Sequence, residues 1–132
     1  MSMTAPIAAL YASLLGVLLI ALAFKVVQYR RTLRIGVGDG GNKDLERAIR
    51  VHANAAEHIP AALLLLLVYE LNGGAPAMLH ACGGVLFLAR VMHAYGLGKS
   101  AGTSFGRFWG VVGTWVVMLT LAVANIVKLF PL

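Results

Sequence analysis

Three polar residues of different chemistry enter an otherwise apolar stretch of the chain. Arg50, Asn54 and Glu57 stand at positions i, i+4 and i+7, and the run from Ala61 to Val68 that follows contains no polar side chain. In an α-helix this spacing places a guanidinium, an amide and a carboxylate on one face. An ionisable group in hydrocarbon costs several kcal/mol unless it is paired or hydrated, so this polar stripe is a candidate functional site.

A second polar group lies in a later apolar segment. Arg90 and His93 are three residues apart on one helix face, and Tyr95 follows on another face. Counted from the nearest basic loop, at a rise of roughly 1.5 Å per residue, Glu57 and Arg90 fall at similar depths. An antiparallel helix pair would then place Arg90 against Glu57, either as part of a ligand site or as an ion pair that fixes helix packing.

The composition indicates a membrane protein. Hydrophobic residues make up 60% of the 132 residues and charged residues 12%, with a mean hydropathy of +0.84. A soluble domain of this size could not cover its surface with so few polar side chains. The single cysteine, Cys82, excludes an internal disulfide and a cysteine-based metal site. Its apolar surroundings in the sequence predict a small buried hydrophobe.

The elements that must position the polar groups are helices. A membrane span takes roughly 20 apolar residues, and the chain has room for about four. We predict helices over 6–34, 43–71, 76–97 and 104–130, within a single domain that covers residues 1–132. The expected fold class is all-α, an integral membrane four-helix bundle with antiparallel, up-down neighbours.

The positive charge is distributed unevenly over the loops. The basic residues of the loops after the first and third predicted helices, with their flanking turns, are Arg30, Arg31, Arg34, Lys43, Arg47, Arg50, Lys99 and Arg107. The opposite side carries only Lys128. The positive-inside tendency therefore predicts that both basic loops are cytoplasmic and both termini lie outside the cytoplasm. Topology, rather than nucleic-acid binding, explains the net charge of +6.

Further arginines could join the polar stripe around a pocket. Arg30, Arg31 and Arg107 are expected near its mouth, although anchoring at lipid headgroups accounts for Arg30 and Arg31 equally well. Several arginines suit a ligand with more than one carboxylate, and an arginine beside a thiol favours the thiolate. Glu57 suits an ammonium group, and Asn54 can supply both a donor and an acceptor. Such a pocket fits a small peptide with two carboxylates, an ammonium group and a thiol.

The helix that carries the polar stripe resembles the signature segment of the MAPEG family, the membrane-associated proteins in eicosanoid and glutathione metabolism. The matching residues are Arg50-x-x-x-Asn54-x-x-Glu57-x-x-Pro60. The pair Arg30-Arg31 resembles the paired arginines of the leukotriene C4 synthase branch. The run from Ala89 to His93 is similar to the helix-three motif of the family, and Arg107 falls about where the family places its thiolate-stabilising arginine. The resemblance covers nearly all of the chain.

This resemblance implies a homotrimer of four-helix protomers that binds glutathione between neighbours and acts as a transferase or peroxidase, without a metal. It implies catalytic roles for Arg107 and Arg31. The residues expected to contact glutathione are Arg30, Arg50, Asn54, Glu57, His58, Arg90, His93 and Tyr95. The sequence departs from the eukaryotic pattern at His58 and His93, where tyrosines are common. The second substrate would be a hydrophobic electrophile or a lipid hydroperoxide, and a bacterial member would lie in the inner membrane.

Two other classes of function remain open at this point. One is a non-catalytic membrane protein of the same fold that packs structurally or binds lipid through its basic rim. The other is a small proton-coupled transporter with Glu57 as the coupling carboxylate, a role that suits a lone acid better than one surrounded by arginines.

Overall fold

A computed structural model describes residues 2–99 and 104–130, with the backbone alone for residues 97–99, so the Lys99 side chain lies outside the described part. All regular structure in these residues is helical: α1 (Pro6–Leu33), α2 (Lys43–Leu71), α3 (Pro76–Lys99) and α4 (Phe105–Val127). Each helix is long and apolar enough to cross a membrane. The predicted all-α membrane bundle is confirmed. The helix α3 continues beyond the predicted end at residue 97, and α4 is shorter at both ends than the predicted 104–130.

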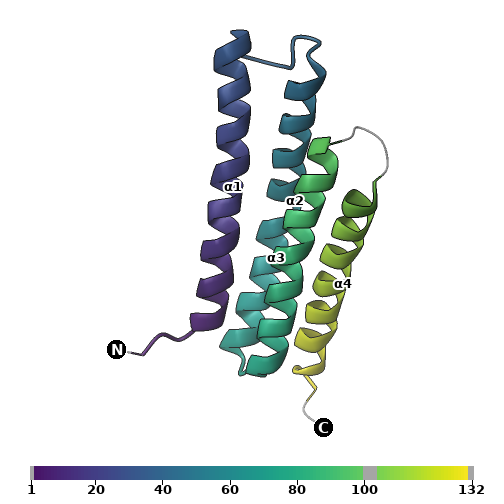
Figure 1. Cartoon of the computed structure of the whole chain (residues 1–132). Coiled ribbons are helices and arrows are strands. Elements are labelled where there is room, and N and C mark those ends of the chain that lie inside the picture. Colours follow the sequence, from purple (N-terminus) through teal and green to yellow (C-terminus); the bar gives the residue numbers. More distant parts are fainter. Residues whose placement is uncertain (1, 100–103, 131–132) are drawn as a thin grey trace.

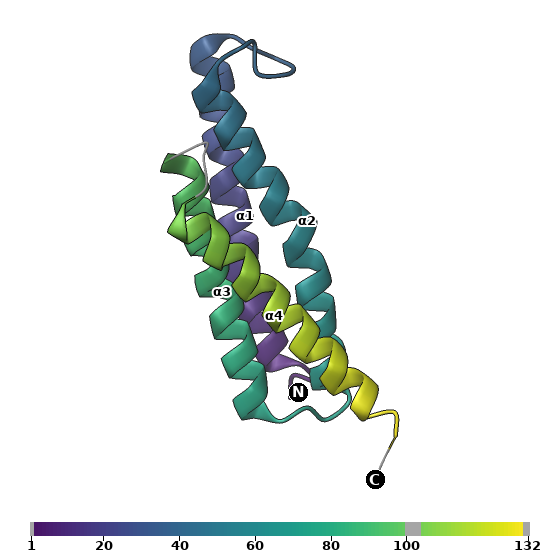
Figure 2. The same ribbon diagram turned by 90° about the vertical axis from the view of Figure 1, so that its right-hand side faces the viewer.

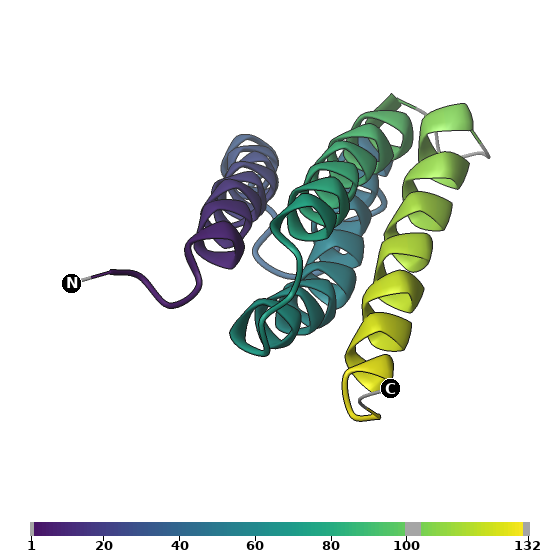
Figure 3. The same ribbon diagram turned by 90° about the horizontal axis from the view of Figure 1, so that it is seen from below.

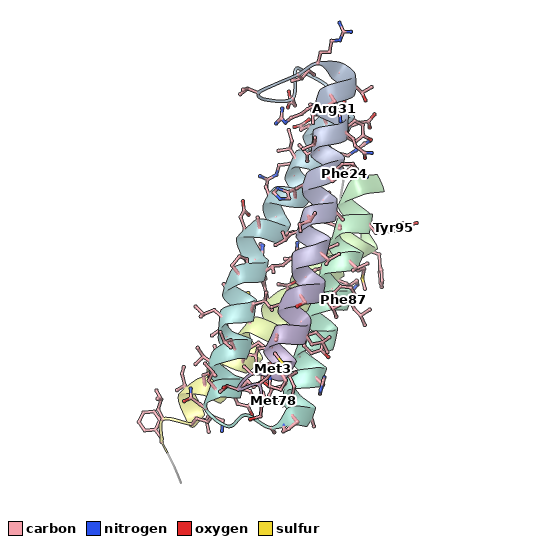
Figure 4. All side chains as sticks on the ribbon, turned by 90° about the vertical axis from the view of Figure 1, so that its left-hand side faces the viewer. Met3, Phe24, Arg31, Met78, Phe87 and Tyr95 are labelled. Atoms are coloured by element: carbon pink, nitrogen blue, oxygen red, sulfur yellow. The ribbon has the colours of Figure 1, made fainter. Side chains whose placement is uncertain are left out.

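The helices run alternately up and down, as predicted (Figure 1). Helices α2 and α3 occupy the middle, with α1 on one side and α4 on the other (Figure 3). Within the described residues α1 packs on α2 and α3, and α4 packs on α3 and α2, but α1 does not contact α4. The α1–α2 loop, the end of α3 and the start of α4 lie at one end, which we call the basic end and where Figure 4 shows Arg31.

Helix α4 runs obliquely, so it has different neighbours at its two ends (Figure 2). Near its start, Gly106 packs closely against Met92 of α3. Near its end, the Asn125 amide Nδ2 donates to the Leu65 carbonyl of α2 at 3.1 Å. Helix α4 therefore leans away from α2 at the basic end, which leaves room there between the two helices.

Local signals explain where α2 and α4 begin. The Asn42 side-chain oxygen accepts hydrogen bonds from the backbone N–H groups of Asp44 and Leu45, at 3.0 and 2.9 Å. Ser104 Oγ accepts from the Arg107 N–H at 3.2 Å in the same way. These are N-caps, which satisfy backbone donors that a helix leaves unpaired in its first turn.

Helix α1 begins differently, with its cap supplied from another helix. Pro6 occupies its first turn, and no side chain at its own N-cap accepts a hydrogen bond. Instead the Glu70 carboxylate at the end of α2 accepts from the Ile7 and Ala8 N–H groups, at 3.0 and 2.6 Å. A carboxylate is stabilising at a helix N-terminus, so this contact fastens α1 to α2. Nothing in the sequence spacing predicts it.

The core lies along the middle of the bundle and draws side chains from all four helices. Its buried residues are Tyr11, Leu15, Ala55, Ile59, Ala62, Leu66, Tyr69, Leu79, Cys82, Leu86, Val117 and Leu121. Cys82 is among them, as its apolar surroundings predict. Helix α2 continues through Pro60 without a break.

Substituting Gly110 with alanine is expected to lower stability by about 1–3 kcal/mol, because the new methyl group would overpack the α3–α4 contact. An added Cβ would lie 2.6 Å from His93 Cβ and 2.7 Å from the Ala89 carbonyl oxygen. Thermal unfolding in detergent, followed by circular dichroism, measures the loss. The control is Gly16→Ala, where a Cβ meets nothing within 4 Å. Equal stability of the two variants would show that α3 and α4 are not in close contact at Gly110.

Candidate functional site

A pocket of about 420 Å³ opens between α2, α3 and α4 at the basic end, where α4 leans away from α2. Four of its lining side chains are cationic, one is a carboxylate, and only one is aliphatic. The lining residues are Lys43, Glu46, Arg47, Arg50, Asn54, His93, Arg107 and Val111. We call this the cationic pocket.

Local acids pair with the two cations closest to the start of α2. Lys43 Nζ lies 2.9 Å from a Glu46 carboxylate oxygen, and Arg47 forms an ion pair with Asp44. These are the ion pairs found within residues 2–99 and 104–130, and neither includes Arg50. The Arg50 guanidinium therefore keeps its charge available for an anionic ligand.

Behind the lining lies Arg90, which is only 1% exposed. Its Nη2 donates to Asn54 Oδ1 at 2.6 Å and to His93 Nδ1 at 3.3 Å, and its Nη1 donates to Thr114 Oγ1 at 3.4 Å. Its three partners are neutral groups. The buried positive charge is therefore not cancelled, and it strengthens the positive potential of the cationic pocket, since charges act more strongly at low dielectric.

The predicted contact between Arg90 and Glu57 is wrong, because Asn54 takes the place of the carboxylate. Glu57 is exposed on the surface of the single chain. Ala55 and Ile59, two residues to either side of it, are each 1% exposed. Residues two apart on a helix point in nearly opposite directions, about 200° apart. Glu57 therefore faces away from the bundle interior, whereas Asn54, at the edge of the polar stripe nearer the core, reaches Arg90.

His58 connects α2 to α4 beside the pocket. Its Nδ1 lies 2.8 Å from the Asn54 carbonyl oxygen, and Trp115 Nε1 donates to its Nε2 at 3.3 Å. Because a carbonyl only accepts and an indole N–H only donates, the proton of a neutral His58 is on Nδ1. Both ring nitrogens are thus used within the chain, and His58 does not line the cationic pocket.

Three other predicted site residues lie elsewhere in the single chain. Arg30 and Arg31 line a separate pocket at the end of α1. Arg30 Nη1 also donates to the carbonyls of Ile35 and Gly38, at 3.3 and 2.8 Å, and so holds the loop that follows α1. Tyr95 is 64% exposed and points outward from α3, as expected two residues after the buried His93 (Figure 4).

The structure thus brings together five of the predicted residues and leaves the others apart. Those at the cationic pocket or directly behind its lining are Arg50, Asn54, Arg90, His93 and Arg107. Those outside it in one protomer are Arg30, Arg31, Glu57, His58 and Tyr95.

Sequence reasoning missed several contributors. The charge distribution explains Lys43 and Arg47 by topology alone. With Arg50 and Asn54, however, they stand at i, i+4, i+7 and i+11 and so extend the polar stripe. Thr114 gave no signal, because a helical threonine usually bonds its own backbone. It does so here, donating to the Gly110 carbonyl at 2.8 Å, while its oxygen still accepts from Arg90.

The sequence model of the MAPEG family matches residues 8–127. Inner membrane protein YecN of Escherichia coli strain K12 is 42% identical to this chain over 120 residues, which cover 91% of this chain and 90% of the relative. The protein of the same name from Escherichia coli O6:H1 matches to the same extent.

Proposed function

The chain belongs to the MAPEG family, and on this premise we propose that it is a membrane-bound enzyme that uses glutathione as a transferase or peroxidase. It is a multi-pass membrane protein, and the name of its relatives supports a position in the inner membrane. Its second substrate is a hydrophobic electrophile or a lipid hydroperoxide. The cationic pocket opens at the basic end, so the proposed orientation exposes it to the cytoplasm.

The observation that carries the proposal is the arrangement of cations in the pocket. Arg50 on α2 and Arg107 on α4 line the same cavity, with the uncompensated charge of Arg90 behind it. Guanidinium groups bind carboxylates with two parallel hydrogen bonds, and glutathione has two carboxylates. Arg50 is assigned to a glutathione carboxylate. Arg107 is assigned to the sulfur, where its positive charge stabilises the thiolate.

The chemistry that follows is nucleophilic attack by the thiolate. In transfer, the sulfur forms a bond to the electrophilic carbon of the second substrate, and the leaving group departs with the electron pair of the broken bond. In peroxidase action, two glutathione molecules are oxidised to the disulfide, and the hydroperoxide is reduced to an alcohol and water. In both cases Arg107 acts on the reacting sulfur, and this chain supplies position and charge rather than a covalent intermediate.

Residues left on the surface of one protomer support the homotrimer that the family resemblance implies. Glu57 is exposed at membrane depth, where a charged group is costly unless a neighbour covers it. In the proposed trimer, Glu57 and Tyr95 face a neighbouring protomer. Arg30 and Arg31 contribute to the site of that neighbour, with Arg31 beside the reacting groups.

Glutathione binding, measured by calorimetry on the detergent-purified protein, tests the proposal. We expect saturable binding by the wild type and at least a tenfold weaker affinity for Arg50→Ala, because a charge-assisted contact contributes about 1.5–3 kcal/mol. The matched control is Lys128→Gln, which removes a cation at the opposite end of the bundle, where Lys128 Nζ contacts the Gly73 carbonyl. Absence of wild-type binding at millimolar glutathione would refute the proposal and favour the non-catalytic, lipid-binding protein.

A further inference from the structure

Two side chains at the cationic pocket, Asn54 and His93, can each donate or accept a hydrogen bond. The Asn54 amide has a donor end and an acceptor end, and a neutral His93 can carry its proton on either ring nitrogen. Which end faces a ligand decides which chemical group the ligand must present. The buried Arg90 contacts both residues, and a guanidinium can only donate.

At Asn54 the contact fixes the orientation of the amide. The distance from Arg90 Nη2 to Oδ1 is 2.6 Å, and the opposite orientation would place two donors against each other. The amide nitrogen, Nδ2, is therefore the end left for the pocket. Within residues 2–99 and 104–130 no group accepts a hydrogen bond from Nδ2, although Asn54 lines the pocket.

At His93 the contact fixes the tautomer. Arg90 Nη2 lies 3.3 Å from Nδ1, which must accept and so carries no proton. The proton of the neutral ring is then on Nε2. His93 also lines the pocket, and its Nε2 has no hydrogen-bond partner in the described part of the chain.

We propose that Arg90 is a positioning residue that makes Asn54 and His93 both present N–H donors to the cationic pocket. The pocket floor then selects a ligand group that accepts hydrogen bonds, such as a carboxylate, a thiolate or a peroxide oxygen, and rejects an ammonium group. This revises the role of Arg90 from ligand contact to support, and of Asn54 from donor and acceptor to donor alone. Only the identity of the ligand rests on the proposed function.

The tautomer of His93 tests the inference without any ligand. The full-length protein, labelled with ¹⁵N-histidine and held in detergent micelles at neutral pH, is studied by nitrogen NMR, and the His93 signals are assigned with His93→Gln. We expect Nδ1 unprotonated and Nε2 protonated in the wild type. Arg90→Lys, which keeps a donor, should retain this pattern, whereas Arg90→Met should allow the proton to redistribute. Protonated Nδ1 in the wild type would overturn the inference, as would an unchanged pattern in a folded Arg90→Met variant.

The polarity of Asn54 is tested by glutathione affinity. Asn54→Asp keeps an acceptor for Arg90 but replaces the pocket-facing N–H donor with an oxygen, and its new ion pair with Arg90 should preserve the fold. Val111→Asp adds the same charge to the α4 wall of the pocket, so it reports charge repulsion alone. We expect Asn54→Asp to bind at least tenfold more weakly than Val111→Asp. Equal affinities would overturn the inference.

The two proposals fail in different ways. If the wild type does not bind glutathione, the proposed function is lost, and the ligand-free tautomer alone decides the role of Arg90. If glutathione binds but His93 carries its proton on Nδ1, the function stands and the positioning role is lost.

Discussion

Replacement of Arg107 with alanine is expected to lower glutathione-dependent turnover roughly 100-fold or more while the affinity for glutathione changes less than about threefold. Arg107 lies in the first turn of α4 and lines the cationic pocket. A cation at a helix N-terminus opposes the helix dipole, so this position favours an anion close by. The guanidinium and the dipole together would stabilise a thiolate. The thiolate charge is expected to affect the reaction rate more than the affinity for the whole peptide.

The measurement separates binding from chemistry. Calorimetry gives the dissociation constant of glutathione, and turnover is followed with an electrophile that changes absorbance on conjugation and with an organic hydroperoxide. Arg107→Lys is the matched variant, because it keeps the charge but loses the planar fork, and it should retain part of the activity. Unchanged turnover in Arg107→Ala would remove Arg107 from the reaction, and an equal loss in affinity would make it a binding residue.

The helices could be predicted because apolar length alone identifies a membrane span. The bounds of α2 follow from the cap at Asn42 and the turn that begins at Asn72, and α2 begins and ends where expected. Helices α3 and α4 pack closely at Gly106 and Gly110, which are four residues apart and allow the two backbones to approach. The cap that Glu70 provides to α1 depends on which helices are neighbours, and spacing along one helix cannot supply that.

The sequence predicts which candidate site residues share a helix face, but not which side chains contact one another. The spacing of Arg50, Asn54 and Glu57 shows that they share a stripe, and depth counting correctly brings Arg90 to the same level. Spacing and depth do not determine how α2 is rotated about its axis. The observed rotation buries Ala55 and Ile59 and turns Glu57 outward, so Arg90 forms its hydrogen bond with Asn54 instead. The helical period of 3.6 residues determines which residues share a face. Which of these residues point to the neighbouring helix is determined by how the helices pack against each other.

Substitution of Asn54 with leucine is expected to destabilise the protein by about 3 kcal/mol or more, because it removes the closest acceptor of a buried cation. Arg90 would retain only the longer contacts to Thr114 and His93, at 3.4 and 3.3 Å. Its Nε already has no hydrogen-bond partner among the described residues. Stability is measured by thermal unfolding in detergent, with the trimer or monomer state checked for each variant.

The double variant Asn54→Leu with Arg90→Met supplies the decisive comparison. Methionine is an uncharged side chain of similar length to arginine, so in the double variant Leu at position 54 no longer faces an unpaired cation. The double variant should therefore recover most of the stability lost in Asn54→Leu. A coupling of about 2 kcal/mol or more between the two sites is expected, since residues in direct polar contact are not independent. Additive losses would mean that Arg90 does not depend on Asn54. Recovery of stability in the double variant would show that the loss in Asn54→Leu comes from the unpaired charge of Arg90.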